Sequence, residues 1–203
     1  MVEKELVNKN NQDDDQQFSK RRRLIGKTAL IVTIIAVAMS IFQFYSAGFK
    51  MLPAMQHRAI HLSLGLMLTF LLYPRSKLEI KKISIIDYLL VLLSVLVGLY
   101  LVIEYKQLIY RSGDPNFLDL LMGFIAVVLV LEATRRVMGW PMVIVALTFL
   151  AYAYFGPYMP AGISHKGYTL KRIIDHMYLT NQGIYGVAIY VSSTFVFTFV
   201  LFG

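Results

Sequence analysis

The sequence has 203 residues, of which 57% are hydrophobic, and it carries a net charge of +8 and no cysteine. Its apolar residues lie in blocks, several of them long enough to cross a bilayer of about 30 Å as a helix of about 20 residues. This excludes a soluble globular domain, and continuous apolar runs favour helices over barrel strands. The basic residues cluster beside the apolar blocks, where lipid headgroups account for them, so nucleic-acid binding is not expected. Without cysteine there is no disulfide, thiol nucleophile or thiolate metal site.

Residues 1–27 form a polar segment in which "NKNNQDDDQQ" precedes "KRRR". The segment has too few apolar residues to fold, which predicts a disordered basic cytoplasmic tail. The apolar run that follows, Thr28 to Phe49, is longer than the roughly 7 to 15 residues of a signal-peptide core. It also has no clear cleavage site, so we expect an uncleaved membrane helix.

Six apolar segments are candidate membrane helices. They are Thr28 to Phe49, a segment between Pro53 and Pro74, Ile83 to Ile103, a segment that begins near Pro115, one that begins at Pro141, and Ile184 to Gly203. The sequence therefore predicts an all-α polytopic membrane protein with about six transmembrane helices. Lysine and arginine are more frequent before the first segment, between the second and third, and between the fourth and fifth than on the other side. The positive-inside rule then places the N-terminus in the cytoplasm.

A short amphipathic segment, "YTLKRIIDHMYL", precedes the sixth apolar run. Leu170, Ile173, Ile174, Met177 and Tyr178 recur at helical spacing on one face, and charged residues take the other. The segment is too short and too charged to span a bilayer. We interpret it as a helix that lies in the outer membrane interface; the alternative is an amphipathic turn packed on neighbouring loops.

Three charged residues, Glu132, Arg135 and Arg136, interrupt the apolar run from 117 to 155. One helix of this length would be about twice as long as the apolar core is thick, so the run needs a break. Three charges at the bilayer centre would cost on the order of 8–10 kcal/mol, which a turn at the cytoplasmic surface avoids. Glu132 precedes the arginines by three and four residues and can pair with either. The pattern predicts a helical hairpin with a charged turn rather than a buried ion site.

The residues around this turn support a break in the helix. Gly139 can end a helix, Trp140 suits the membrane interface, and Pro141 suits the first position of the next helix. At the other end of the first helix of the hairpin, Asp114 can act as the N-cap and Pro115 can occupy the first turn.

No signature of an enzyme is present, because both a G-x-S-x-G elbow and a phosphate-binding glycine loop are absent. His57 and His61 are spaced i, i+4, but no nearby acidic ligand completes a metal site, and an interfacial position beside Arg58 is the preferred interpretation. Asp87 and Glu104 lie near the ends of predicted helices, so no acidic residue marks an ion pathway. We expect no enzyme, no bound metal and no bound cofactor.

Three adjacent hydroxyl residues, Ser192, Ser193 and Thr194, lie in the last apolar segment. Such groups can bond one helix to another, coordinate an ion, or bond back to their own backbone. Helix packing is the preferred interpretation, because membrane helix interfaces are enriched in serine and threonine.

Four blocks of sequence carry a resemblance to a known family. The blocks are "QHRAIHLSLGLMLTFLLYP" (56–74), "LDLLMGFIAVVLVLEATRRVMGW" (118–140), "AYFGPYMP" (153–160) and "YLTNQGIYGVAIYVSSTFVFTFVLFG" (178–203). In this order they resemble the fused permease of tripartite ATP-independent periplasmic (TRAP) transporters, of the TAXI-associated type, over roughly residues 28 to 203. The run from Glu132 to Arg136 followed by Gly139 and Trp140 is the most specific part. Gln182 departs from the pattern, because an acidic residue is common there in the family.

The resemblance implies a secondary transporter in a bacterial or archaeal cytoplasmic membrane. A periplasmic binding protein of the TAXI type captures an organic anion, often a carboxylate, and an ion gradient, usually of sodium, drives its uptake without ATP. Residues 28–113 would correspond to the small scaffold-like subunit. Residues 114–203 would supply the hairpin, the interfacial helix and the start of the large transport part.

The family's substrate and sodium hairpins lie in the portion that follows, so the chain is expected to be an incomplete N-terminal part whose partners include the rest of the large part. Its substrate-binding residues are therefore not assigned. We expect Glu132, Arg135 and Arg136 to hold the junction between the scaffold and transport parts. The alternative is a scaffold or assembly subunit that does not itself transport.

Overall fold

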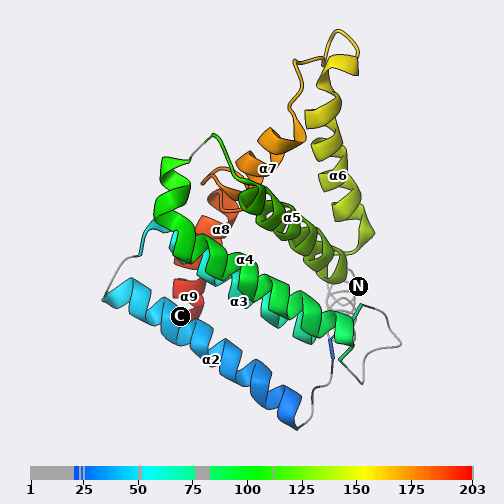
Figure 1. Cartoon of the computed structure of the whole chain (residues 1–203). Helices are drawn as coiled ribbons and strands as arrows, with labels where there is room; N and C mark the ends of the chain where they lie inside the picture. The colour runs from blue at the N-terminus through cyan, green and yellow to red at the C-terminus, as the bar shows by residue number, and fades with distance from the viewer. Residues whose placement is uncertain are drawn as a thin grey trace, which may run out of the picture.

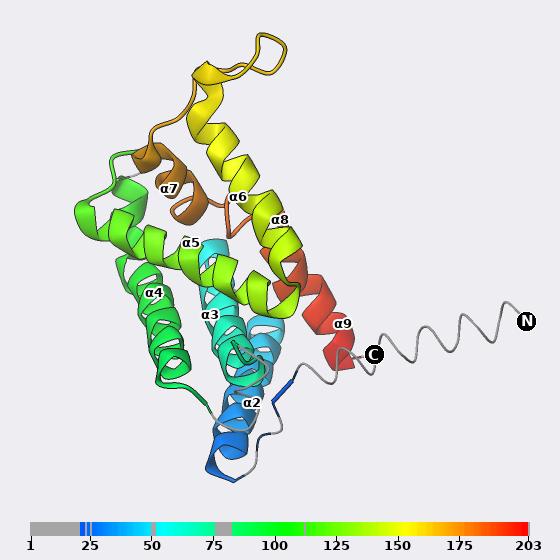
Figure 2. The same cartoon turned by 90° about the vertical axis from the view of Figure 1, so that its right-hand side faces the viewer.

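The computed structural model describes residues 21–22, 24, 26–49, 52–75, 83–111 and 113–202, and all regular structure there is helical. The predicted disorder of residues 1–27 falls almost entirely outside this range. The longer helices are α2 (Lys27–Gly48), α3 (Ala54–Leu72), α4 (Ile85–Tyr110), α5 (Phe117–Val137) and α6 (Trp140–Phe155). Figure 1 shows α2, α3 and α4 running beside one another, whereas α6 rises away from them, and Figure 2 shows α5 crossing over α4 and α3.

Four stretches are long and apolar enough to cross a membrane: Thr28–Gly48, Ile85–Tyr110, Phe117–Val137 and Trp140–Tyr158. The chain is therefore a helical membrane protein, as predicted, although the described residues hold fewer candidate spans than the six expected. Of the other two segments, α3 carries His57, Arg58 and His61 in its first two turns, which lowers its hydropathy. The last apolar segment is interrupted. The orientation in the membrane stays a prediction.

The last apolar segment is not one regular helix from Ile184. It consists of α8 (Val187–Val191), a π-helical turn (η3, Ser192–Val196) and α9 (Phe197–Phe202). The helix begins at Val187 rather than Ile184 because a tight turn precedes it. Gly183 lies in this turn, where a Cβ would be 2.5 Å from the Cα of Met177, so only glycine fits. In Figure 2 this C-terminal rod lies on the other side of α3 from α4, and it contacts both α2 and α3.

The centre of the bundle is the packing of α3 against α4. Ala59 and Phe70 of α3 and Leu101 of α4 are fully buried in one apolar cluster. The two helices lie close together at Gly98, where an added Cβ would lie 2.9 Å from the Cβ of Ser63. Small residues at such a crossing let helix backbones come together, which is how membrane helices gain packing energy.

The amphipathic segment forms the predicted helix, α7 (Leu170–Tyr178). Its apolar face packs on α5, where Ile174 and Tyr178 meet Gly123. Tyr178 is fully buried and its hydroxyl donates to the carbonyl of Val97 in α4, at 2.7 Å. The face expected to lie against lipid is therefore largely used for packing within the protein, and an interfacial position of the outer face stays a prediction.

Helix boundaries around α5 differ in detail from those predicted. Asn116, not Asp114, is the N-cap of α5, and Asp119 completes a capping box by accepting from the backbone N–H of Asn116 at 2.8 Å. Asp114 instead pairs with Lys171 of α7 at 2.7 Å, and this contact lowers the pKa of Asp114. Either Asp114 or Asn116 could act as an N-cap by residue type. Asn116 takes this position because Asp119, three residues later, completes the capping box with it.

We expect Gly98→Val to destabilise the protein, because the new side chain must displace Ser63 and separate α3 from α4. Overpacking of this kind typically costs about 1–3 kcal/mol. Thermal unfolding in detergent micelles, with helix content followed by circular dichroism, measures the change. Gly65→Ala in α3 is the matched control, because a Cβ there meets nothing within 4 Å and helix propensity favours alanine. Equal thermal midpoints for the two variants would contradict a close contact at Gly98.

Candidate functional site

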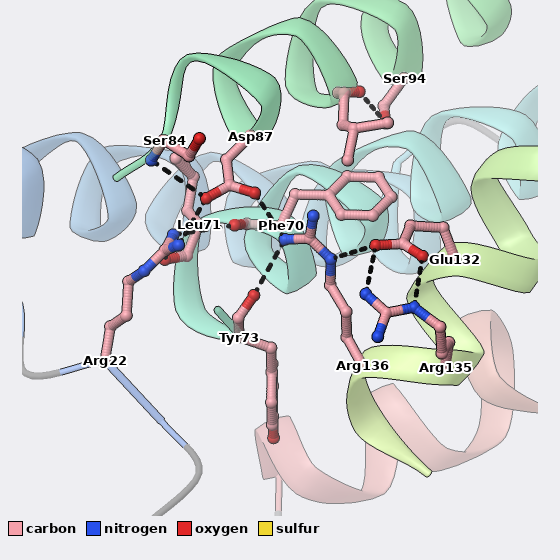
Figure 3. Close-up of polar contacts among 11 residues, drawn as sticks. Arg22, Phe70, Leu71, Tyr73, Ser84, Asp87, Ser94, Glu132, Arg135 and Arg136 are labelled. Carbon is pink, nitrogen blue, oxygen red and sulfur yellow. Dashed lines mark hydrogen bonds and ion pairs between the residues drawn. The ribbon is translucent and has the colours of Figure 1, made fainter. Parts of the chain in front are cut away.

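A buried cluster of charged side chains surrounds Asp87, in the first turn of α4 (Figure 3). The carboxylate is fully buried and binds two guanidinium groups, one on each oxygen. Oδ2 pairs with Arg22, which precedes α2, and Oδ1 accepts from Nη1 of Arg136, in the last turn of α5, at 2.7 Å. Oδ2 also accepts from the backbone N–H of Ser84 at 3.2 Å, which caps α4. One carboxylate thus joins three parts of the chain.

The two arginines also bind the end of α3. Arg22 donates to the carbonyls of Phe70 and Leu71, each at 3.3 Å, and Arg136 donates to the carbonyl of Tyr73 at 3.1 Å. The last carbonyls of a helix have no partner within it and carry a partial negative charge. Guanidinium groups therefore satisfy these carbonyls and stabilise the C-terminal end of α3.

Glu132 extends the network along α5, as its spacing predicted. Its carboxylate accepts from Arg135 at 2.7 and 2.8 Å and from Nε of Arg136 at 2.8 Å. Arg135 also stacks over Trp140, with its guanidinium carbon 5.7 Å from the ring centre. We call the set Arg22, Asp87, Glu132, Arg135 and Arg136 the ion clasp.

The ion clasp adds burial that the sequence did not indicate. The charges were expected at a turn at the cytoplasmic surface, and that position in the membrane stays a prediction. Within the protein the side chains of Arg136 and Asp87 have no exposed surface. The turn itself is as predicted: Gly139 ends α5, and its φ of 93° requires glycine. The next helix begins at Trp140, one residue before the expected Pro141. The turn and the buried ion site therefore coexist, because Arg136 points back into the bundle (Figure 3).

The clasp carries three positive and two negative side chains, a sum of +1. One donor, Nη2 of Arg136, is buried and has no hydrogen-bond partner among the described residues. The guanidinium lies over the ring of Phe70, 5.1 Å from its centre, and this cation–π contact supplies part of the missing stabilisation. Both carboxylates of the clasp are engaged by arginine, and the set joins the ends of α3, α4 and α5.

A second ion cluster lies where α4 ends and α5 begins. Asp119 is fully buried and accepts from the hydroxyl of Tyr100 at 2.5 Å and from Arg111 at 3.4 Å. Arg111 also pairs with Glu104 at 3.2 Å. The antiparallel helices α4 and α5 are thus joined by ion pairs at both ends.

The two histidines of α3 were expected to snorkel at the membrane interface beside Arg58, but the protein encloses their side chains. Both are buried and bind the side chain of Gln43 in α2. The Gln43 amide donates to Nδ1 of His61 at 2.5 Å, and its oxygen accepts from Nε2 of His57 at 3.0 Å. Gln43 was not singled out in the sequence, because a lone glutamine in an apolar run gives no sign of its partner.

The three hydroxyls of the last segment divide between two roles. Ser193 and Thr194 donate to their own helix, at the carbonyl of Tyr190, with distances of 3.3 and 2.6 Å. Ser192 lies 3.4 Å from Nε2 of His61, across the interface with α3. Helix-to-helix bonding is therefore limited to Ser192, and back-bonding accompanies the π-helical turn.

Within the described ranges no group of three histidine or acidic side chains could hold a metal ion. No protein-family model, curated protein or solved structure matches the chain. The fold and the two ion clusters define its class, a helical membrane protein whose helix ends are joined by buried ion pairs.

We expect Asp87→Asn to lower the free energy of unfolding by about 3–5 kcal/mol, because it leaves two buried guanidinium groups without a counter-charge. Unfolding by sodium dodecyl sulfate in mixed micelles measures this difference. Asp114→Asn is the control, since its pair with Lys171 is solvent-exposed and such pairs contribute little. A stability loss no larger for Asp87→Asn than for Asp114→Asn would show that the buried pair is not needed for stability.

Substitutions of Arg136 and Arg135 compare a buried ion pair with a partly exposed one. Arg136→Ala removes bonds to Asp87, Glu132 and Tyr73, and we expect a cost of about 3–5 kcal/mol. Arg135→Ala removes a partly exposed pair on the same helix and the stacking over Trp140, for which about 1 kcal/mol is expected. The same unfolding assay compares them. If both variants lose the same stability, Arg136 does not act through α3 and α4.

Proposed function

We propose that the chain is a membrane permease component of an ion-gradient-driven uptake system for an organic anion, working with a periplasmic substrate-binding protein. The observation that carries the proposal is the ordered set of four sequence blocks that resemble TAXI-associated TRAP permeases. In this proposal sodium is the coupling ion, and the membrane is the cytoplasmic membrane of a bacterium or archaeon. The four apolar stretches are consistent with such a membrane component.

The geometry of the ion clasp supports a role for the charged block at a junction. Glu132, Arg135 and Arg136 lie at the end of α5, and Arg136 reaches both α3 and α4. In the proposed organisation α2 to α4 belong to the scaffold-like part and α5 begins the transport part. The bonds from Arg136 would hold the end of α5 on the scaffold-like part, so that the transport part is anchored where it begins.

A second candidate, a scaffold or assembly subunit that does not transport, is favoured by the positions of the acidic side chains. In the described spans Asp87 and Asp119 occupy first turns, and Glu104 and Glu132 lie within the last two turns. All four are engaged by arginine. A coupling cation would therefore find no spare carboxylate within these helices, as expected of a subunit that does not itself transport.

The proposal predicts sodium-dependent uptake by cells that express the full permease gene with its binding protein. The assay follows a panel of ¹⁴C-labelled carboxylates and replaces sodium by choline. We expect accumulation to fall at least tenfold without sodium or without the binding protein, because the first supplies the driving force and the second delivers the anion. Uptake indifferent to both changes would contradict the transporter. No uptake, together with a stable complex containing a separate large subunit, would favour the scaffold.

A further inference from the structure

A cavity with a mainly apolar lining and a few polar groups lies between α2, the start of α3 and the last apolar segment (α8, η3 and α9). Its volume is about 400 Å³, and residues from all three elements line it. Arg58 of α3 supplies its cationic group, and Ser46 of α2 and Thr198 of α9 supply hydroxyls. None of the lining residues is acidic. A cavity with one fixed positive charge and hydroxyl donors, and without a carboxylate, is chemically complementary to an anion.

Arg58 differs from the arginines of the two ion clusters. Arg22, Arg111, Arg135 and Arg136 each bind a carboxylate, whereas no ion pair formed by the described residues includes Arg58. Its contacts are a hydrogen bond from Nη1 to the carbonyl of Tyr185, at 2.6 Å, and stacking over Tyr190, 4.8 Å from the ring centre. Both contacts orient the guanidinium, and neither neutralises it.

The hydrogen-bonding capacity of Arg58 is also incomplete. Its Nε is buried and has no hydrogen-bond partner within the described ranges. Since Nη1 is engaged by Tyr185, the remaining edge of the guanidinium is the one formed by Nε and Nη2. That edge binds two oxygens of a carboxylate or phosphate side by side. A guanidinium that is partly buried and has no counter-charge is unfavourable, and an oxyanion bound to Arg58 from the cavity would neutralise it.

We infer that this cavity is a binding site for a single oxyanion group, a carboxylate or a phosphate, held by Arg58 with help from the hydroxyls of Ser46 and Thr198. The ligand is either a small organic acid or the headgroup of an anionic lipid. The site is distinct from the ion clasp, whose carboxylates already occupy its arginines. The inference concerns equilibrium binding and does not depend on transport. The binding test can therefore fail while the uptake assay succeeds, and the uptake assay can fail while the binding test succeeds.

The test uses the full chain in nanodiscs of phosphatidylcholine, in Tris chloride buffer that contains no competing oxyanion. Isothermal titration measures binding of butanoate, with butanamide as the uncharged analogue. Native mass spectrometry after exposure to phosphatidylglycerol measures lipid retention. The variant Arg58→Gln removes the charge, and Arg172→Gln is the matched control, because Arg172 is exposed on α7 and does not line this cavity.

We expect one of the two anions to bind the parent chain and the Arg172→Gln variant, and to bind Arg58→Gln at least tenfold more weakly, as for loss of a charge-assisted hydrogen bond. Loss of butanoate binding identifies an organic acid as the ligand, and loss of phosphatidylglycerol retention identifies a lipid. Butanamide should not bind. No binding of either anion, or binding that survives Arg58→Gln, would overturn the inference.

Arg58 also supports the chain before α8, so Arg58→Gln is paired with milder variants that leave this contact in place. Thr198→Val and Ser46→Ala keep the arginine and each remove one hydroxyl. We expect each to weaken anion binding severalfold while the thermal midpoint stays within a few degrees of the parent value. If Arg58→Gln does not fold and neither milder variant changes the affinity, the assignment of the cavity is wrong.

Discussion

The arrangement of the helix ends depends on one interaction, the buried pair between Asp87 and Arg136. Removing two charges from water costs several kcal/mol per ion, and only complete pairing offsets that cost. Here both oxygens of Asp87 have arginine partners, and Arg136 also binds Glu132 and a carbonyl of α3. The charges sit where helix dipoles favour them, an acid at the start of α4 and a base at the end of α5. Position and pairing together make the buried charges tolerable.

The clasp supplies what apolar helix surfaces lack in a membrane. Lipid tails are as apolar as leucine, so contact between two leucine-rich faces gives little preference for one register over another. Many large side chains of α4 and α5, such as Leu92, Leu96 and Phe124, are exposed on the surface of the single chain and carry no such information. Ion pairs at both ends of the α4–α5 pair, and the close crossing at Gly98, are directional. They fix which helices are neighbours and how far each is shifted along its axis.

Local features were predictable from the sequence, and contacts between distant residues were not. Spacing alone gave the pairing of Glu132 with Arg135 and Arg136, and Gly139 marked the turn, because both follow from the geometry of one helix. The partner of Arg136 is 49 positions away, and Asp87 looked like an ordinary acid near a helix end. Nothing in its own neighbourhood indicates which arginine reaches it. For the same reason, nothing in the sequence indicated that Gln43 binds two histidines. The prediction of one unbroken last helix was also based on local composition, which does not indicate the π-helical turn.

The contrast between Arg136 and Arg58 shows why burial alone does not identify a functional charge. Each is a guanidinium at a helix end with one buried nitrogen that lacks a partner. Around Arg136 two carboxylates fill the space, so the group is neutralised and its role is to hold helices together. Around Arg58 the protein supplies a carbonyl, an aromatic ring and a cavity, but no carboxylate among the described residues. A positive charge that the fold orients without neutralising is the arrangement expected of a group whose counter-ion is a ligand.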